Sequence, residues 1–152
     1  MNRQDPPFSV LHLDHVVIRV RDVEPMVDFY RHRLGCPLER VAAEIGLHQL
    51  RAGSSLIDLV DAEGPLGRDG GPPPSGRGGN MDHLCLRVDP FDAEAIEAWL
   101  DAADISHSPP ARRYGADGFG SSIYLEDPEG NRVELKGPPE AGPGPGPTQA
   151  GS

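Results

Sequence analysis

The sequence predicts an α+β fold built from two tandem βαβββ modules, which extend over about residues 11–63 and 81–136. Each stretch shows the same order of patterns, in which one strand is followed by a helix and then by further strands. A segment dense in Gly and Pro separates the two stretches. At 152 residues the chain has the length of one ordinary domain, so we expect the two modules to share a single site.

The first module begins with a run of branched apolar residues that is typical of a strand. Asp22 is expected to lead a helix through Pro25 and Tyr30, and Gly35 is expected to end it. The predicted strands of this module are Leu11–Val20, Leu38–Val41, Gly46–Ala52 and Ser55–Val60.

The second module repeats this order, beginning with a strand over Asp82–Val88. Its helix is predicted over Asp92–Ala103, because apolar side chains recur there on one helical face. Strands follow, and the last two, Ser121–Glu126 and Asn131–Lys136, form a hairpin. A Pro-then-Gly sequence between them suits a tight turn.

Three segments lie outside the predicted modules. Residues 1–10 form an N-terminal extension, and residues 64–80 read as a long exposed connector. Residues 137–152 have almost nothing apolar to bury, so this tail is expected to be disordered.

The composition favours a small-molecule ligand over a nucleic acid or a membrane. The net charge is -10, and phosphate binding needs clustered Lys and Arg. No run approaches the roughly 20 apolar residues of a membrane span, and no secretory signal is seen, so we expect a cytoplasmic location. Cys36 and Cys85 lack the spacing of a structural zinc site and are expected to be buried free thiols.

The two modules also match residue by residue at an offset of 68. Asp14 and His15 correspond to Asp82 and His83 at this offset. At the far end of each module, Ile57-Asp58-Leu59 parallels Val133-Glu134-Leu135. Each module therefore offers one histidine on its first strand and one carboxylate on its last, as an internal duplication around a shared site would. Two imidazoles with one or two carboxylates suit Zn, Ni, Co, Mn or Fe(II) and leave positions open for substrate.

Structural alternatives stand beside this metal hypothesis. A single histidine on an apolar strand is often a core residue with satisfied hydrogen bonds, but the repeated Asp-His pair favours ligands. Glu134 could instead be a solvent-facing charge beside Arg132 and Lys136. Asp58 reaches less far than a glutamate, so a three-ligand site without Asp58 is also consistent with the sequence.

Three further residues are candidates for substrate binding. His48 lies in a predicted strand, where it could line the pocket or only pack. Arg113 and Tyr114 precede a Gly-rich run and could be carried by a flexible loop that clamps a carboxylate or phosphate, although a solvated turn is the alternative. The remaining histidines, His12, His32 and His107, are expected at the surface.

The segments LDHVVIRVRDVEPMVDFYRHRLG, MDHLCLRV and SSIYLEDPEGNRVELKG together resemble the vicinal oxygen chelate superfamily. The resemblance covers about residues 11–136 and implies one domain whose mixed sheets form a cup- or barrel-like metal site. It places the family's metal ligands at His15, Asp58, His83 and Glu134. Glyoxalase I usually has Glu where this chain has Asp58, and three-ligand members use a His-His-Glu set.

The resemblance implies that the metal chelates two adjacent oxygens of the substrate. We therefore expect a metal-dependent, glyoxalase-like lyase or isomerase acting on a small oxygenated substrate, with Glu134 as the catalytic proton acceptor. One alternative is an Fe(II) extradiol-type dioxygenase or a thiol transferase acting on an antibiotic. Another is a metal-free small-molecule binding protein. The resemblance also implies a homodimer, in which sites often combine one module from each chain.

Overall fold

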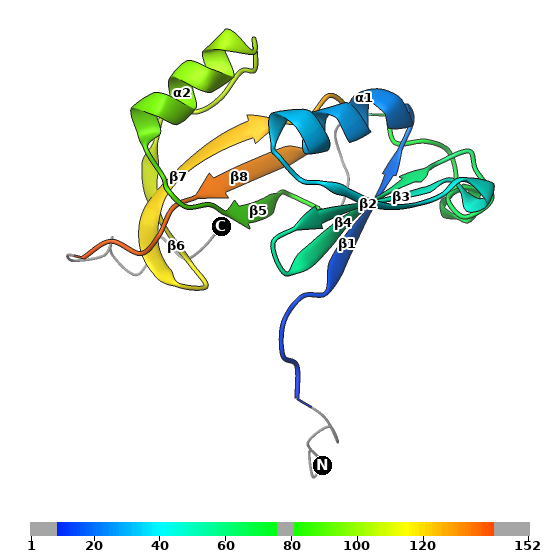
Figure 1. The fold of residues 1–152 in the computed structure, drawn as a ribbon, viewed down its shortest axis with the longest axis horizontal. Coiled ribbons are helices and arrows are strands. Elements are labelled where there is room, and N and C mark those ends of the chain that lie inside the picture. Colours follow the sequence, from blue (N-terminus) through cyan, green and yellow to red (C-terminus); the bar gives the residue numbers. More distant parts are fainter. Residues whose placement is uncertain (1–8, 76–80, 142–152) are drawn as a thin grey trace. The chain divides into compact units, whose positions relative to one another are not determined.

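The computed structural model describes residues 9–75 and 81–141, and the chain divides into two compact units, residues 1–73 and 74–152. Each unit contains one four-stranded mixed sheet and one α-helix (Figure 1). The predicted α+β class and the paired βαβββ modules are confirmed.

The first unit forms a sheet in the order β1-β4-β3-β2, in which only β1 and β4 run parallel. This order places the first and last strands of the module side by side. Its elements are β1 (His15–Val20), α1 (Val23–Asp28), the π-helix η1 (Phe29–Arg33), β2 (Leu38–Ala42), the short 3-10 helix η2 (Ala43–Ile45), β3 (Leu47–Ala52) and β4 (Ser55–Asp61).

The helix of the first unit follows the predicted segment but changes from an α-helix to a wider π-helix in its second half. Asp22 occupies the N-cap position without a capping hydrogen bond from its side chain. After Asp28 the helix widens into η1, where the Leu34 N–H donates to the Phe29 carbonyl five residues earlier. Gly35, at φ 75°, ends the segment in a conformation that a side chain would strain.

The second unit repeats the topology with the order β5-β8-β7-β6 and parallel pairing of β5 with β8. Its Asp92 caps α2 by accepting a hydrogen bond from the Ala95 N–H. The elements are β5 (Leu84–Arg87), α2 (Ala93–Ala102), β6 (Ala111–Gly115), β7 (Gly118–Glu126) and β8 (Arg132–Lys136).

The predicted tight turn between β7 and β8 is organised by one carboxylate. Asp127 is buried, and its Oδ1 accepts from the backbone N–H groups of Glu129 and Asn131 at 3.0 and 2.9 Å. Gly130 adopts φ 82° in this turn. The turn residues therefore fix the register that places Glu134 on its strand.

Both first strands are shorter than predicted. β1 begins at His15 rather than Leu11, because its partner β4 begins only at Ser55 and offers no ladder further back. β5 likewise begins at Leu84, so His83 lies immediately before the strand.

The predicted connector is not wholly exposed. Gly64 and Gly67 are buried, and the Arg19 guanidinium donates to the Gly67 carbonyl at 2.8 Å. A Cβ at Gly67 would lie 2.1 Å from the Asp61 carbonyl oxygen, so only glycine fits there. A 3-10 turn, η3 (Arg68–Gly70), follows. Residues 76–80 lie outside the described part of the chain.

The start of the predicted tail also differs from the expectation. The Gly137 N–H donates to the Ser121 carbonyl at 2.8 Å, and the Glu140 N–H donates to the Phe119 carbonyl at 2.7 Å. The Ser121 hydroxyl adds a hydrogen bond to the Glu140 carboxylate. Backbone groups dock this segment on β7, so apolar side chains are not required. Residues 142–152 lie outside the described residues.

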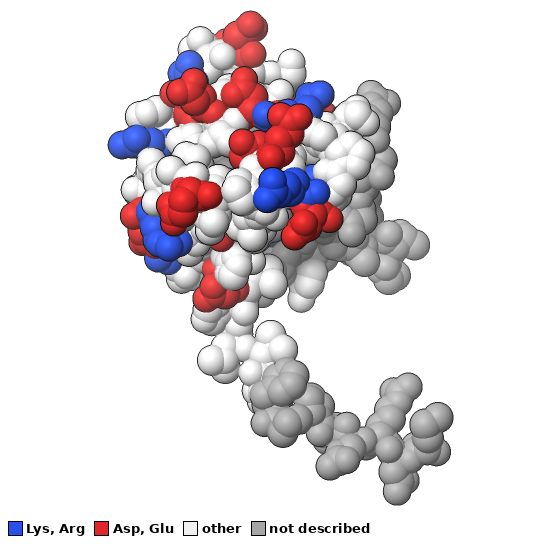
Figure 2. Space-filling view, turned by 90° about the vertical axis from the view of Figure 1, so that its right-hand side faces the viewer, with Lys and Arg blue, Asp and Glu red and all other residues white. Residues whose placement is uncertain are grey.

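Charge is dispersed over the molecular surface seen in Figure 2. Acidic and basic side chains alternate there, and the described residues on this face form no extended basic patch. No helix within the described residues is long and apolar enough to cross a membrane.

Candidate metal-binding site

The first unit brings His15 and Asp58 to one face of its sheet. Val17 lies opposite Asp58 in the parallel ladder, so their side chains share a face. Side chains two residues apart on a strand also share a face, so His15 lies on the same face as Val17. The Asp14 carboxylate hydrogen-bonds His15 Nδ1 at 2.7 Å. This hydrogen bond, aided by the negative charge of Asp58, raises the pKa of His15.

Asp58 is buried with an exposed fraction of 4%, and its two carboxylate oxygens differ in their surroundings. Its Oδ2 accepts from Gln49 Nε2 at 3.1 Å. Its Oδ1 is buried and has no hydrogen-bond partner in the part of the chain that the structure describes. A buried carboxylate oxygen without a donor is costly unless a cation binds it.

The second unit brings His83 and Glu134 together in the same way. The Asp82 carboxylate holds His83 Nδ1 at 2.6 Å, while His83 Nε2 lies 3.7 Å from Glu134 Oε1. Only 14% of the His83 side chain and 1% of the Glu134 side chain are exposed. The Tyr124 ring packs edge-on against the imidazole, with a centroid distance of 5.4 Å.

These two pairs fit the requirements of metal ligands. In each histidine an aspartate occupies Nδ1, which leaves Nε2 for a metal and fixes the orientation of the ring. Two ligand atoms at 2.0–2.1 Å on a tetrahedral ion lie about 3.4 Å apart, close to the 3.7 Å between His83 and Glu134. Within residues 9–75 and 81–141 no group of three or more candidate ligands is assembled, so each unit offers one pair.

The duplication extends to the side chains that flank each carboxylate. Gln49 and Tyr124 occupy equivalent positions, each opposite the carboxylate of its unit on the neighbouring antiparallel strand. Arg40 donates to Gln49 Oε1 at 2.9 Å and so orients the amide that binds Asp58. Sequence reasoning missed Gln49, although a polar residue opposite Asp58 would have been the signal once the strand register was known.

Cys85 lies opposite Glu134 in the ladder and is exposed as a residue, contrary to the expectation of a buried thiol. Its thiol nevertheless donates to Glu134 Oε2 at 3.2 Å. The sulfur is partly shielded from water although the residue is exposed. This desolvation, followed by the hydrogen bond to Glu134 and the negative charge of Glu134, raises the pKa of Cys85 to about 12. Cys85 therefore remains a thiol at neutral pH and orients Glu134 rather than acting as a nucleophile. Cys36 is buried as expected.

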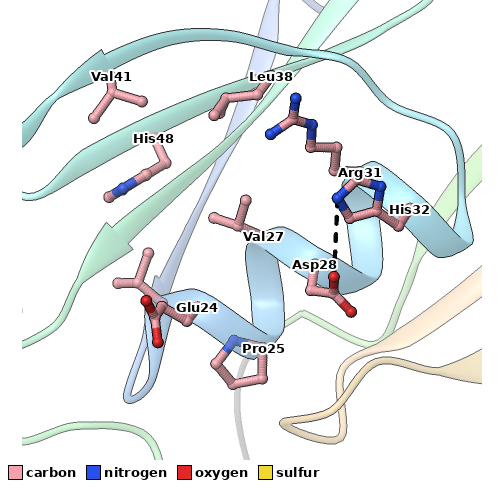
Figure 3. Close-up of a pocket in the computed structure, with 10 residues that line it drawn as sticks. Glu24, Pro25, Val27, Asp28, Arg31, His32, Leu38, Val41 and His48 are labelled. Carbon is pink, nitrogen blue, oxygen red and sulfur yellow. Dashed lines mark ion pairs between the residues drawn. The ribbon is translucent and has the colours of Figure 1, made fainter.

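His48 lies on the opposite face of the first sheet from Asp58. It faces Leu59 and Val41 across the ladders, whereas Gln49 faces Asp58. On that side an open pocket of about 650 Å³ lies between α1 and the strands β2 and β3 (Figure 3). His48 Nδ1 is buried there without a hydrogen bond from any described residue. A substrate role for His48 stays a prediction, but the fold does not bring it to His15 and Asp58.

Arg113 and Tyr114 lie in β6 and not in the expected flexible loop, because β6 pairs with β7 through a tight connection at Gly115–Gly118. Arg113 shares the face of Glu134: its guanidinium donates to Ser122 Oγ at 3.1 Å and stacks 4.5 Å from the Tyr124 ring centroid. Tyr114 lies on the other face and packs against Phe119.

The other histidines divide into two kinds. His12 and His32 are exposed, as expected. His107 is largely covered, because Nδ1 contacts the Ser108 carbonyl and Nε2 contacts the Asp101 carboxylate, both at 2.9 Å. The surface prediction for His107 was wrong, since this ring ties the end of α2 to the segment beside β7.

Comparisons with known proteins agree with the fold. A glyoxalase domain-containing protein of Mycosarcoma maydis is 31% identical over 133 residues, covering 88% of this chain and 72% of that protein. The crystal structure of a virulence protein from Salmonella typhimurium superposes with a TM-score of 0.70 at 26% identity, covering 86% of this chain and 99% of that chain. An antibiotic binding protein from Streptomyces gives a TM-score of 0.63 at 25% identity, covering 86% and 98%.

A family model supplies the assignment. The model for the Glyoxalase/Bleomycin resistance protein/Dioxygenase superfamily, which is the vicinal oxygen chelate superfamily, matches residues 12–135. This match includes both histidine–carboxylate pairs. The chain therefore belongs to the Glyoxalase/Bleomycin resistance protein/Dioxygenase superfamily.

Proposed function

We propose that this protein is a metal-dependent enzyme of the glyoxalase type, a lyase or isomerase that acts on a small oxygenated substrate. The metal ligands in this proposal are His15, Asp58, His83 and Glu134. The observation that carries it is the repeated pairing of a histidine, oriented through Nδ1 by the preceding aspartate, with a buried carboxylate on the same sheet face. A structural role for these histidines would not require the same arrangement in both units.

When bound, a divalent ion supplies Lewis acidity that lowers the cost of negative charge on a chelated substrate oxygen. Glu134 accepts a proton from the substrate carbon, because its longer side chain has more freedom than that of Asp58. The Cys85 thiol donates a hydrogen bond to Glu134 Oε2, and Glu134 Oε1 lies on the side of His83, 3.7 Å from Nε2. Burial of Glu134 keeps bulk water from competing for that proton.

Elemental analysis of the purified full chain tests the metal assignment. We expect about one divalent ion per chain, because four ligands complete one site. The double substitution of His15 and His83 by Ala should abolish uptake, while His12→Ala, in an exposed side chain three residues before His15, should retain it. Full metal occupancy in the double variant would exclude these ligands.

A substrate panel tests the reaction class. For a proton-transfer reaction, Glu134→Gln should lower turnover by roughly 10²- to 10⁴-fold, since it keeps the shape and removes the base. Asp58→Asn should lower turnover less. Full turnover in metal-loaded Glu134→Gln would contradict proton transfer and favour the alternatives, an Fe(II) dioxygenase or a thiol transferase acting on an antibiotic. Oxygen consumption identifies the first of these, and dependence on an added thiol identifies the second.

A second candidate function is a small-molecule binding protein without a metal. The similarity to an antibiotic binding protein from Streptomyces over most of both chains favours this reading. It predicts ligand binding that a strong chelator leaves unchanged. Loss of ligand binding after metal removal would instead support the enzyme proposal.

We also propose a homodimer, as superfamily members often dimerise. Light scattering at micromolar concentration should give twice the chain mass of 16.3 kDa. A monomer mass at that concentration would contradict the dimer while leaving the ligand assignment intact.

A further inference from the structure

Lys136 is a buried cation on the same sheet face as Glu134. It lies two residues after Glu134 on β8, so alternation points both side chains to one side. Its exposed fraction is only 4%, and it is the only lysine among the 152 residues. Burial of an ammonium group is costly unless an anion or hydrogen-bond acceptor compensates it.

Two glycines give the Lys136 side chain its space. A Cβ at Gly115 would lie 2.6 Å from Lys136 Cε, and a Cβ at Gly120 would lie 3.0 Å from Lys136 Nζ. Both positions lie in the β6–β7 hairpin. A side chain at Gly115 would displace the lysine, and one at Gly120 would meet the Pro138 carbonyl at 2.5 Å as well as Nζ, so the side chain of Lys136 occupies the space that these glycines leave.

The basic groups of this unit differ in whether carboxylates neutralise them. Arg87 pairs with Asp117 at 3.1 Å, and Arg132 lies 3.8 Å from Asp82. The Lys136 ammonium has no hydrogen bond or ion pair to any residue in the ranges 9–75 and 81–141, although its charge acts on the nearby Cys85 thiol. Arg113, on the same face, bonds to the neutral hydroxyl of Ser122 and pairs with no carboxylate among those residues.

Register brings Lys136 and Arg113 near the same hydroxyl. Ser122 lies directly opposite Lys136 in the β7–β8 ladder and is fully buried. Arg113 reaches the Ser122 hydroxyl, and Lys136 Nζ lies against Gly120, the residue opposite Arg113 in the β6–β7 ladder. The two cationic groups and the hydroxyl therefore gather on neighbouring positions of one face. Such a cluster suits an oxyanion, which accepts charge-assisted hydrogen bonds from all three groups.

We infer that Lys136, with Arg113 and Ser122, binds the anionic end of the substrate, a carboxylate or a phosphate-type group. This inference rests on the proposed function for the position of the reacting oxygens beside Glu134. Two strand residues span roughly 7 Å, so the substrate class is a small acid whose anionic group lies a few bonds from its chelating oxygens. The anion site itself does not require the metal.

The single lysine makes a direct test practical. The full chain is labelled with lysine carrying ¹⁵N at Nζ, freed of metal by a chelator, and mixed with inorganic phosphate or acetate at constant ionic strength set with chloride. We expect a saturable shift of the one side-chain signal, and the tighter of the two probes identifies the preferred anionic group. A shift no different from that of chloride alone would overturn the inference, and this measurement needs no variant to fold.

Calorimetry with phosphate supplies the matched comparison. Lys136→Met keeps the apolar stem and should weaken phosphate binding by roughly tenfold to a hundredfold, as loss of a charged hydrogen bond does. The control is Arg87→Met, which also removes one positive charge, at the residue opposite Lys136 in the ladder. Because Asp117 already pairs with Arg87, this substitution should change phosphate affinity by less than about twofold. Equal phosphate affinity in Lys136→Met and wild type would refute the site.

A separate zinc titration without phosphate distinguishes this inference from the proposed function. If neither wild type nor Lys136→Met binds zinc while phosphate still binds wild type, the metal proposal fails and the anion site stands. If Lys136 only balances the charge of Glu134, Lys136→Met should alter the zinc affinity, and the phosphate titration of the wild type should show no saturation. That pair of results would overturn the anion site.

Discussion

Replacing Asp82 by Asn should weaken metal binding strongly while leaving the fold nearly unchanged. The Asp82 carboxylate hydrogen-bonds His83 Nδ1 at 2.6 Å, so it fixes the ring and makes Nε2 a better ligand. Loss of such an outer carboxylate costs about 10- to 100-fold in metal affinity. The Asp82 side chain is 78% exposed, so the urea concentration at the midpoint of unfolding should stay close to that of the wild type.

A competition titration against a chromophoric chelator measures this affinity. Asp14→Asn should act in the same direction, because Asp14 holds His15 as Asp82 holds His83. Asp28→Asn is the matched control: Asp28 also faces a histidine, His32, at 3.9 Å, but neither belongs to the proposed ligand set. Wild-type affinity in Asp82→Asn, or an equal loss in Asp28→Asn, would refute the role given to these aspartates.

Three other predictions concern stability. Gln49→Leu removes the only hydrogen-bond donor to the Asp58 side chain within the described residues. In urea titrations of the metal-free chain it should lower the free energy of unfolding by about 1–3 kcal/mol, and no change would contradict the buried contact. A chain that ends at Lys136 should melt a few degrees below a chain that ends at Ala141, because it lacks the hydrogen bonds of Gly137 and Glu140 to β7; equal melting temperatures in calorimetry would contradict this docking. The hydrogen bonds of His107 to the Ser108 carbonyl and then to the Asp101 carboxylate raise the pKa of His107. The stability that protonated His107 contributes should therefore be complete below pH 6.5 and lost as the pH rises through the raised pKa. Equal stability-against-pH profiles for wild type and His107→Gln would disprove this contribution.

The sequence predicted the paired modules because duplication repeats chemistry as well as pattern. The offset that aligns His15 with His83 also aligns Val17 with Cys85, and the structure places these two residues opposite Asp58 and Glu134. The placement of a histidine near a carboxylate within each unit could therefore be predicted from the sequence.

The sequence did not predict equally well which face of the sheet each side chain occupies. A shift of one residue moves a side chain to the other side of a sheet, and the register of β3 and β6 depends on hairpin geometry. His48 and Tyr114 consequently lie on the faces away from the carboxylates. Their neighbours Gln49 and Arg113 share the faces of Asp58 and Glu134.

Hydrophobic patterning also cannot detect segments held by backbone groups. Gly137 and Glu140 dock through N–H donors to β7, and Gly67 is fixed by close backbone approach and by Arg19. Apart from the half-exposed Leu66, neither segment offers a large apolar side chain, so composition alone predicted an exposed connector and a disordered tail.

X-ray absorption spectroscopy of the zinc-loaded full chain tests the central claim most directly. The account predicts nitrogen and oxygen ligands at about 2.0–2.2 Å, with multiple-scattering features of two imidazoles that disappear in His15→Ala/His83→Ala. Cys85, held as a thiol by Glu134, should contribute no sulfur. A sulfur ligand at about 2.3 Å, or a spectrum without two imidazoles, would contradict the proposed site.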